Sequence, residues 1–121
     1  MIDFKMLQSF VDAVYNTLGL YKPLDIQFRF CRESEFDAEY WPKFKDSGKI
    51  KRHIIRVYIT DDLKFNRDFQ TLIAHELIHA WQAENDIDDI HGQLFQEWAG
   101  KLEKEFGPIL IRRVYDAELD I

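Results

Sequence analysis

The spacing of apolar residues along this chain changes from a helical to a strand period, and this change constrains the fold more than any other feature. Over residues 4–18 apolar side chains recur at steps of three and four, which is typical of an amphipathic helix, and Gly19 is expected to end it. After Pro23, apolar and polar residues alternate over 24–30, which predicts a half-buried strand. The chain therefore opens with a helix and a strand, as in an α+β domain.

The middle of the chain divides into an irregular stretch and a second strand. Residues 31–49 show no clear period and contain Pro42 and Gly48 as breakers, so we expect a loop there. Residues 54–60 are mainly β-branched or aromatic and predict a strand.

The second half of the chain predicts two helices and a last strand. Asn66 or Asp68 is expected to cap a helix that runs to about Glu84. The apolar residues of 95–106 mark a third helix, and 109–115 predict a final strand. The expected architecture is α+β, with an N-terminal helix, a small sheet of about three strands and two further helices around one core.

Composition limits the class of protein. The chain has 121 residues, which suits a single domain spanning 1–121. A formal charge of −6 disfavours a globally basic binder of nucleic acid. The one cysteine, Cys31, excludes an intramolecular disulfide and a multi-cysteine zinc site in this chain, and we expect it to be a small core residue. We recognise no signal peptide and no long apolar run, so a cytoplasmic protein without a membrane partner is expected.

The strongest chemical signal is the pentapeptide His75-Glu76-Leu77-Ile78-His79. On a helix, residues i and i+4 lie on one face, so the two imidazoles can reach one metal ion. This is the metalloprotease pattern, in which zinc polarises the peptide carbonyl and a carboxylate such as Glu76 takes a proton from the attacking water. We expect both histidines to lie off the main buried stripe of the helix. The alternative is a core helix that carries two surface histidines without a metal.

A catalytic zinc ion needs a third protein ligand and an open fourth position. His91 is the leading candidate because it follows His79 after a short acidic loop and lies at the start of the third helix. Glu97 is the rival, since a glutamate on the next helix completes some zinc sites. The spacing alone does not decide whether His91 or Glu97 is the third ligand.

These motifs carry a resemblance to a known family. The run from His75 to Trp81, followed by His91-Gly92 and then by Phe95, resembles the SprT-like (Spartan-type) zinc metallopeptidase domain. That family has HExxH, a loop of variable length, and His-Gly with an aromatic residue three positions after the glycine. The match covers about residues 50–115.

The resemblance implies a fold, a reaction and a set of site residues. It implies that 1–121 is a single SprT-like metallopeptidase domain of minimal zincin-like fold, with Zn²⁺ as cofactor. The implied activity is metalloendopeptidase cleavage of a protein or peptide substrate, with Glu76 as general base and with His75, His79 and His91 as zinc ligands. DNA-associated or crosslinked proteins are a substrate class that the family adds, which makes DNA a further expected partner. The alternative is a non-catalytic, metal-stabilised binding or adaptor module.

Two charged segments carry weaker signals. Residues 41–52 concentrate Lys and Arg between aromatic residues, which predicts either a nucleic-acid surface or a solvated loop with Trp41 and Phe44 tucked into the core. The acidic run 84–89 lacks the full pattern of a calcium loop, so we expect a solvated turn. One of its acids is alternatively expected to orient a metal-bound imidazole.

Three further side chains and one strand complete the predictions. His53 precedes a strand and is expected to be exposed. Tyr58 and Tyr115 are either hydrogen-bond donors to the transition state or ordinary aromatic residues. The strand over 55–60 directly precedes the active helix, so we expect it to form the sheet edge beside the cleft. An extended peptide can add to such an edge by backbone hydrogen bonds, which predicts a loosely specific protease.

Overall fold

The computed structural model describes residues 3–30, 38–59 and 66–106. Over these residues the chain is an α+β domain with three helices and one three-stranded sheet. In chain order the elements are α1 (Phe4–Leu18), β1 (Leu24–Phe30), β2 (Ala38–Phe44), β3 (Ile50–Ile59), α2 (Asn66–Glu84) and α3 (Gln93–Phe106). None of the helices in this described part has the length and apolar character that a membrane span requires.

The first helix begins and ends where the periodicity predicts. The Asp3 carboxylate accepts hydrogen bonds from the backbone N–H groups of Lys5 and Met6, which satisfies donors that have no partner inside the helix. Gly19 follows the last turn in the left-handed conformation, with φ of 73°, which a residue without a Cβ adopts at little cost. The predicted helix over 4–18 and the strand over 24–30 are therefore confirmed.

The sheet has the strand order β1-β3-β2, with β1 parallel and β2 antiparallel to the central strand β3. The prediction that 55–60 forms an edge of the sheet is therefore wrong, because β3 has a partner on each side. The loop expected over 31–49 is also wrong in part, since 38–44 pairs with β3 as β2. Pro42 does not prevent this pairing because an edge strand can leave one side without backbone donors. The strand predicted over 109–115 lies outside the described residues.

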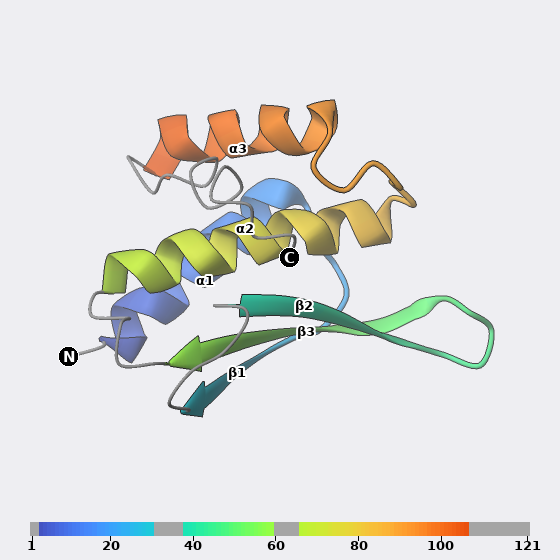
Figure 1. The fold of residues 1–121 in the computed structure, drawn as a ribbon, viewed down its shortest axis with the longest axis horizontal. Coiled ribbons are helices and arrows are strands. Elements are labelled where there is room, and N and C mark those ends of the chain that lie inside the picture. The colour runs from blue at the N-terminus through green and yellow to red at the C-terminus, as the bar shows by residue number, and fades with distance from the viewer. Residues whose placement is uncertain (1–2, 31–37, 60–65, 107–121) are drawn as a thin grey trace.

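The three helices lie on one side of the sheet, and α2 lies between the strands and α3 (Figure 1). This helix contacts β2, β3, α1 and α3, and every residue from 71 to 80 is buried. The prediction that His75 and His79 lie off the buried stripe is therefore wrong. A helix surrounded by other elements has no solvent-facing side, so its buried surface is wider than the apolar stripe in its sequence.

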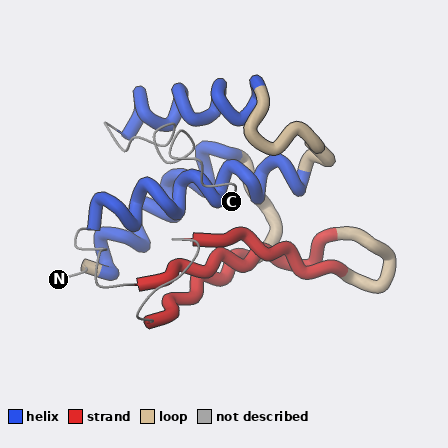
Figure 2. The backbone as a smooth tube through the Cα atoms, viewed as in Figure 1, coloured by secondary structure: helices blue, strands red, loops and turns tan. Residues whose placement is uncertain are grey.

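The strands β2 and β3 form a hairpin whose turn extends beyond the helices (Figure 2). Gly48 occupies the turn with φ of 86°, a conformation that favours glycine. Trp41 is 50% exposed and Phe44 is 60% exposed. The expectation that these two aromatics are tucked into the core is thus wrong: Trp41 shares the sheet face of Glu39, opposite the helices, and Phe44 lies near the turn of the hairpin.

Candidate metal centre

Three histidines from two segments of the chain converge on one point. The Nε2 atoms of His75 and His79 lie 3.1 Å apart, and those of His75 and His91 lie 3.4 Å apart. One ligand atom from each residue lies within 4.8 Å of the other two. Two nitrogens that bind one zinc ion tetrahedrally at ~2.0–2.1 Å would be about 3.3 Å apart. The three imidazoles are therefore close enough to hold a metal ion.

Local structure explains why these rings meet. The helical period of α2 places His75 and His79 one above the other on the side that faces α3. The chain then leaves α2, turns through residues 85–90 and returns His91 to the same point. Phe95, fully buried on the first turns of α3, lies against all three imidazoles with ring centroids 4.8–5.1 Å away. The aromatic residue of the sequence motif thus forms an apolar wall of the site.

Gln82 is the hydrogen-bond partner of one of these rings. Its Oε1 lies 2.9 Å from Nδ1 of His79, and its Nε2 donates to the backbone carbonyls of Asp89 and Ile90 at 3.1 Å and 2.8 Å. The side chain is 3% exposed. The structure thus gives His79 a neutral amide one turn along α2 as a hydrogen-bond partner, a residue outside the acidic run 84–89. The i, i+3 spacing from His79 is the signal that would have identified it.

Gly92 explains the second half of the His-Gly motif. A Cβ added at this position would lie 1.8 Å from Oδ2 of Asp89, far inside the distance that two atoms tolerate. The backbone N–H of Gly92 also donates to the carbonyl of Asp89 at 3.1 Å. A side chain at position 92 would therefore displace the exposed carboxylate of Asp89, which lies in the turn that carries His91.

Glu76 follows His75 in the sequence, and its carboxyl group has a raised pKa. Its side chain is fully buried, and none of the described residues donates a hydrogen bond to either carboxylate oxygen. Burial raises the pKa of the Glu76 carboxyl well above its ordinary value, and the charge of Glu39 acts in the same direction. A divalent cation next to such a group favours its ionised form. A buried carboxylate without a hydrogen-bond partner, one residue along α2 from His75, fits the donor set of a metal centre.

Several predicted site residues lie elsewhere. Glu97 is exposed, and its Oε1 accepts from Gln93, so the described residues place only His91 with the histidine pair. The acidic run 84–89 forms no cluster of ligands within the described part of the chain. The Tyr58 hydroxyl donates to Glu39 on the sheet face opposite the helices, and Tyr115 and Cys31 lie outside the described residues.

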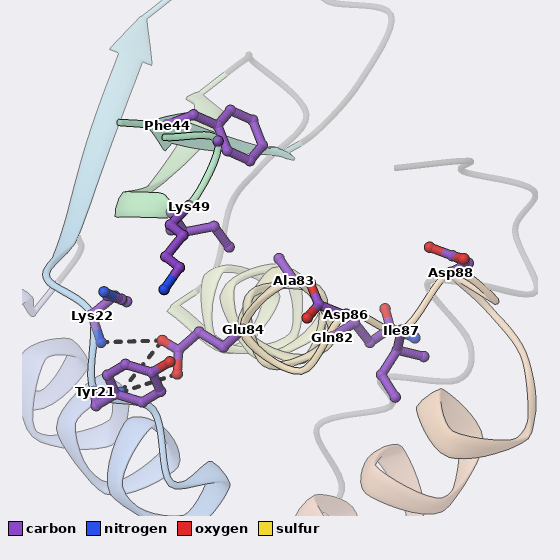
Figure 3. A pocket seen from close by; sticks show the side chains of 12 residues that line it. Tyr21, Lys22, Phe44, Lys49, Gln82, Ala83, Glu84, Asp86, Ile87 and Asp88 are labelled. Atoms are coloured by element: carbon purple, nitrogen blue, oxygen red, sulfur yellow. Dashed lines mark hydrogen bonds between the residues drawn. The ribbon is translucent and has the colours of Figure 1, made fainter. Parts of the chain in front are cut away.

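A second buried polar network joins the C-terminal end of α2 to the sheet. His53, predicted to be exposed, is fully buried, which makes that prediction wrong. Its Nε2 lies 2.5 Å from Oε2 of Glu84, and its Nδ1 lies 2.6 Å from the Tyr40 hydroxyl. Glu84 also accepts from the backbone N–H groups of Tyr21 and Lys22 (Figure 3). This network anchors the last residue of α2 to β3 and to the connection between α1 and β1.

The cavity drawn in Figure 3 lies at this same end of α2 and has a volume of about 440 Å³. The β2–β3 hairpin, the end of α2 and the turn after it contribute its walls. Gln82 reaches its lining, but His75, His79 and His91 do not. The cavity therefore does not include the histidine cluster, although Gln82 lines the cavity and bonds to His79.

Comparisons of the chain with protein-family models, with curated proteins and with solved structures found no match.

Proposed function

We propose that this protein is a zinc-dependent metalloendopeptidase of the SprT-like, zincin-like type. The observation that carries the proposal is the convergence of His75, His79 and His91, and the buried Glu76, which follows His75 on the same helix, supports it. Three protein ligands, one of them partly exposed, are the number that leaves zinc an open position for water or substrate. We further propose that the protein acts in the cytoplasm, since its single cysteine suits a reducing compartment.

The chain's own residues have defined tasks in this reaction. When bound, zinc supplies a Lewis acid that polarises a peptide carbonyl and lowers the pKa of water. Glu76 acts as general base: it accepts the proton of the attacking water and delivers it to the departing amine. Phe95 excludes water from the side of the three imidazoles on which it packs.

The substrate we propose is an extended, flexible peptide segment. In the described sheet β2, and not 55–60, is the edge strand that contacts α2. Its outer edge has backbone groups with which an extended chain can pair, although Pro42 offers no donor there. Backbone pairing depends little on side chains, which favours loose sequence specificity.

The test compares wild type with Glu76→Gln for metal content and for cleavage of casein. We expect both proteins to bind one equivalent of zinc, and we expect the variant to lose at least the roughly 10²–10⁴-fold that a general base contributes. Equal activity in the two proteins would contradict the mechanism. A wild-type protein that binds zinc, loses stability on chelation and cleaves nothing would favour the adaptor module instead.

An association with DNA is a second proposal, and exposure of the hairpin aromatics favours it. The guanidinium of Arg56 lies 5.5 Å above the ring of Trp41, and Phe44 is exposed near the basic turn of the hairpin. Exposed aromatics among cations can stack bases and neutralise phosphates. Fluorescence anisotropy with labelled single-stranded DNA should show binding that weakens steeply with salt. A flat titration at low salt would remove this proposal and leave the peptidase unaffected.

A further inference from the structure

We infer that Gln82 is a positioning residue of the metal centre: its one amide sets the tautomer of His79 and ties the loop that carries His91 to α2. The inference rests on the proposed metal centre. It does not require peptidase activity. Its basis is three hydrogen bonds made by a single buried side chain between the two segments that supply the ligands.

The orientation of the Gln82 amide follows from its surroundings. The carbonyl oxygens of Asp89 and Ile90 only accept hydrogen bonds, so the amide group that faces them must be the NH₂. The remaining amide oxygen then faces His79. Reversing the amide would place its oxygen against two carbonyl oxygens and break both hydrogen bonds, which a buried side chain tolerates poorly.

The tautomer of His79 follows from that orientation. An amide oxygen only accepts, so Nδ1 of His79 must carry the proton that it shares with Gln82. In a neutral imidazole this leaves the lone pair on Nε2, and Nε2 is the atom that lies 3.1 Å from Nε2 of His75. Gln82 therefore prepares His79 as a ligand through the nitrogen that points to the centre of the cluster.

The same amide also limits the movement of His91. The two carbonyls that it holds belong to the residues one and two positions before His91. The backbone N–H of Ile87 donates back to the carbonyl of Gln82 at 2.9 Å, so the loop is attached to this residue by its main chain as well. Because the side chain and the backbone of Gln82 both hold this loop, His91 stays near the pair on α2 before any metal binds.

The first test needs no variant. In metal-free wild type at about pH 8, where an imidazole of ordinary pKa is neutral, two-bond ¹H–¹⁵N correlation of ¹⁵N-histidine reports which ring nitrogen carries the proton. We expect His79 to be the Nδ1–H tautomer. A proton on Nε2 would overturn the inference, whatever the variants do.

The second test separates the two tasks of the amide. Cobalt(II) is titrated into each protein and followed by its visible absorption, with zinc as competitor. Gln82→Met removes all three side-chain hydrogen bonds, and we expect a mixture of His79 tautomers and roughly 10–100-fold weaker metal binding. Gln82→Glu keeps an acceptor for His79 but lacks donors for the loop, so we expect the wild-type tautomer with weakened binding and an altered cobalt spectrum.

Gln93→Met is the matched control, because Gln93 is exposed and its amide donates to Glu97. We expect the control to bind cobalt as wild type does. Metal affinity of Gln82→Met within about twofold of wild type would overturn the inference, and so would wild-type affinity in Gln82→Glu. A wild-type protein that binds no cobalt would overturn the metal centre itself. Full activity of Glu76→Gln would instead contradict only the proposed peptidase mechanism.

Discussion

The Nε2 atoms of His75 and His91 lie 3.4 Å apart, although 16 positions separate the two residues in the chain. One side of this pair is fixed by the helix α2, whereas the other depends on a short connection and on the first turns of α3. Phe95 packs on both rings, and Gln82 holds the backbone just before His91. Substitutions along this connection should therefore act on metal binding. Substitutions of Glu84, at the C-terminal end of α2, should act on stability.

His91 and Glu97 should differ sharply in their effect on zinc binding. His91→Ala removes a ring that contacts the other two, so we expect zinc affinity to fall by more than the roughly 10–100-fold that loss of an outer hydrogen-bond partner costs. Glu97→Ala removes an exposed side chain and should leave affinity unchanged. Competition against a coloured zinc chelator measures both. Loss of zinc in Glu97→Ala would show that the rival ligand is the true one.

Gly92→Ala should act through Asp89. The new Cβ displaces the Asp89 carboxylate, which disturbs the turn before α3 and should weaken zinc binding several-fold. Asp89→Ala removes the same contact from the other side. Because the two substitutions break one relationship, the double variant should bind zinc no more weakly than the worse single variant. Additive losses in this double-mutant cycle would contradict the contact between the two residues.

Phe95→Ala should destabilise the domain and weaken metal binding together. The ring is fully buried among the three imidazoles, so we expect a loss of about 3–5 kcal/mol in the free energy of unfolding. Phe44→Ala is the control of the same type, since Phe44 is 60% exposed and should change stability by only about 0.5 kcal/mol. Urea unfolding of the metal-free proteins measures both values. Similar losses in the two variants would contradict the role of Phe95 as a wall of the site.

Glu84→Ala should cost stability without removing a metal ligand. The carboxylate accepts from the fully buried His53 and from two backbone N–H groups, and its loss removes the partner that Nε2 of His53 has at this end of α2. We expect a loss of about 3–5 kcal/mol, as for other broken buried pairs. The exposed Glu105 in α3 supplies the control variant Glu105→Ala, which should lie within about 0.5 kcal/mol of wild type. An effect of Glu84→Ala as small as this would mean that the anchor contributes little.

Tyr40 should make the domain sensitive to alkaline pH. Burial raises the pKa of the Tyr40 phenol far above its ordinary value, and the charge of Glu84 acts in the same direction. Because the folded state holds the proton more tightly, the stabilisation is complete below the unfolded pKa of about 10 and is lost as pH rises above it. Thermal unfolding between about pH 9 and 11 should show a smaller decline for Tyr40→Phe than for wild type. Parallel declines would contradict a raised pKa at this residue.

The elements that the sequence predicted well are those defined by local periodicity. The helix α1 and the strand β1 have the expected bounds, and α2 ends at Glu84 as expected, but it begins at Asn66, so Asn66 and Asp68 lie within the helix rather than before it. The spacing of His75 and His79 also predicted that the two rings would share one side of a helix. These features depend on neighbours within one or two turns, so a single stretch of sequence contains the information.

The errors have a common physical cause. Pro42 looks like a strand breaker until the strand is known to lie at an edge, and His53 looks like a surface residue until Glu84 and Tyr40 are known to face it. Gln82 is an ordinary helical residue until the loop carbonyls are placed above it. Each of these assignments requires the position of a segment that is distant in the chain.

By itself, the sequence determined where the described helices run, that strands accompany them, and which side chains are chemically able to bind zinc. Only the tertiary structure decided that the third histidine reaches the pair, that residues 71–80 of α2 are all buried, and that the amide of Gln82 meets His79. The reason is that backbone periodicity is set by each residue's near neighbours, whereas burial and hydrogen-bond partners are set by whichever layer packs on the other side.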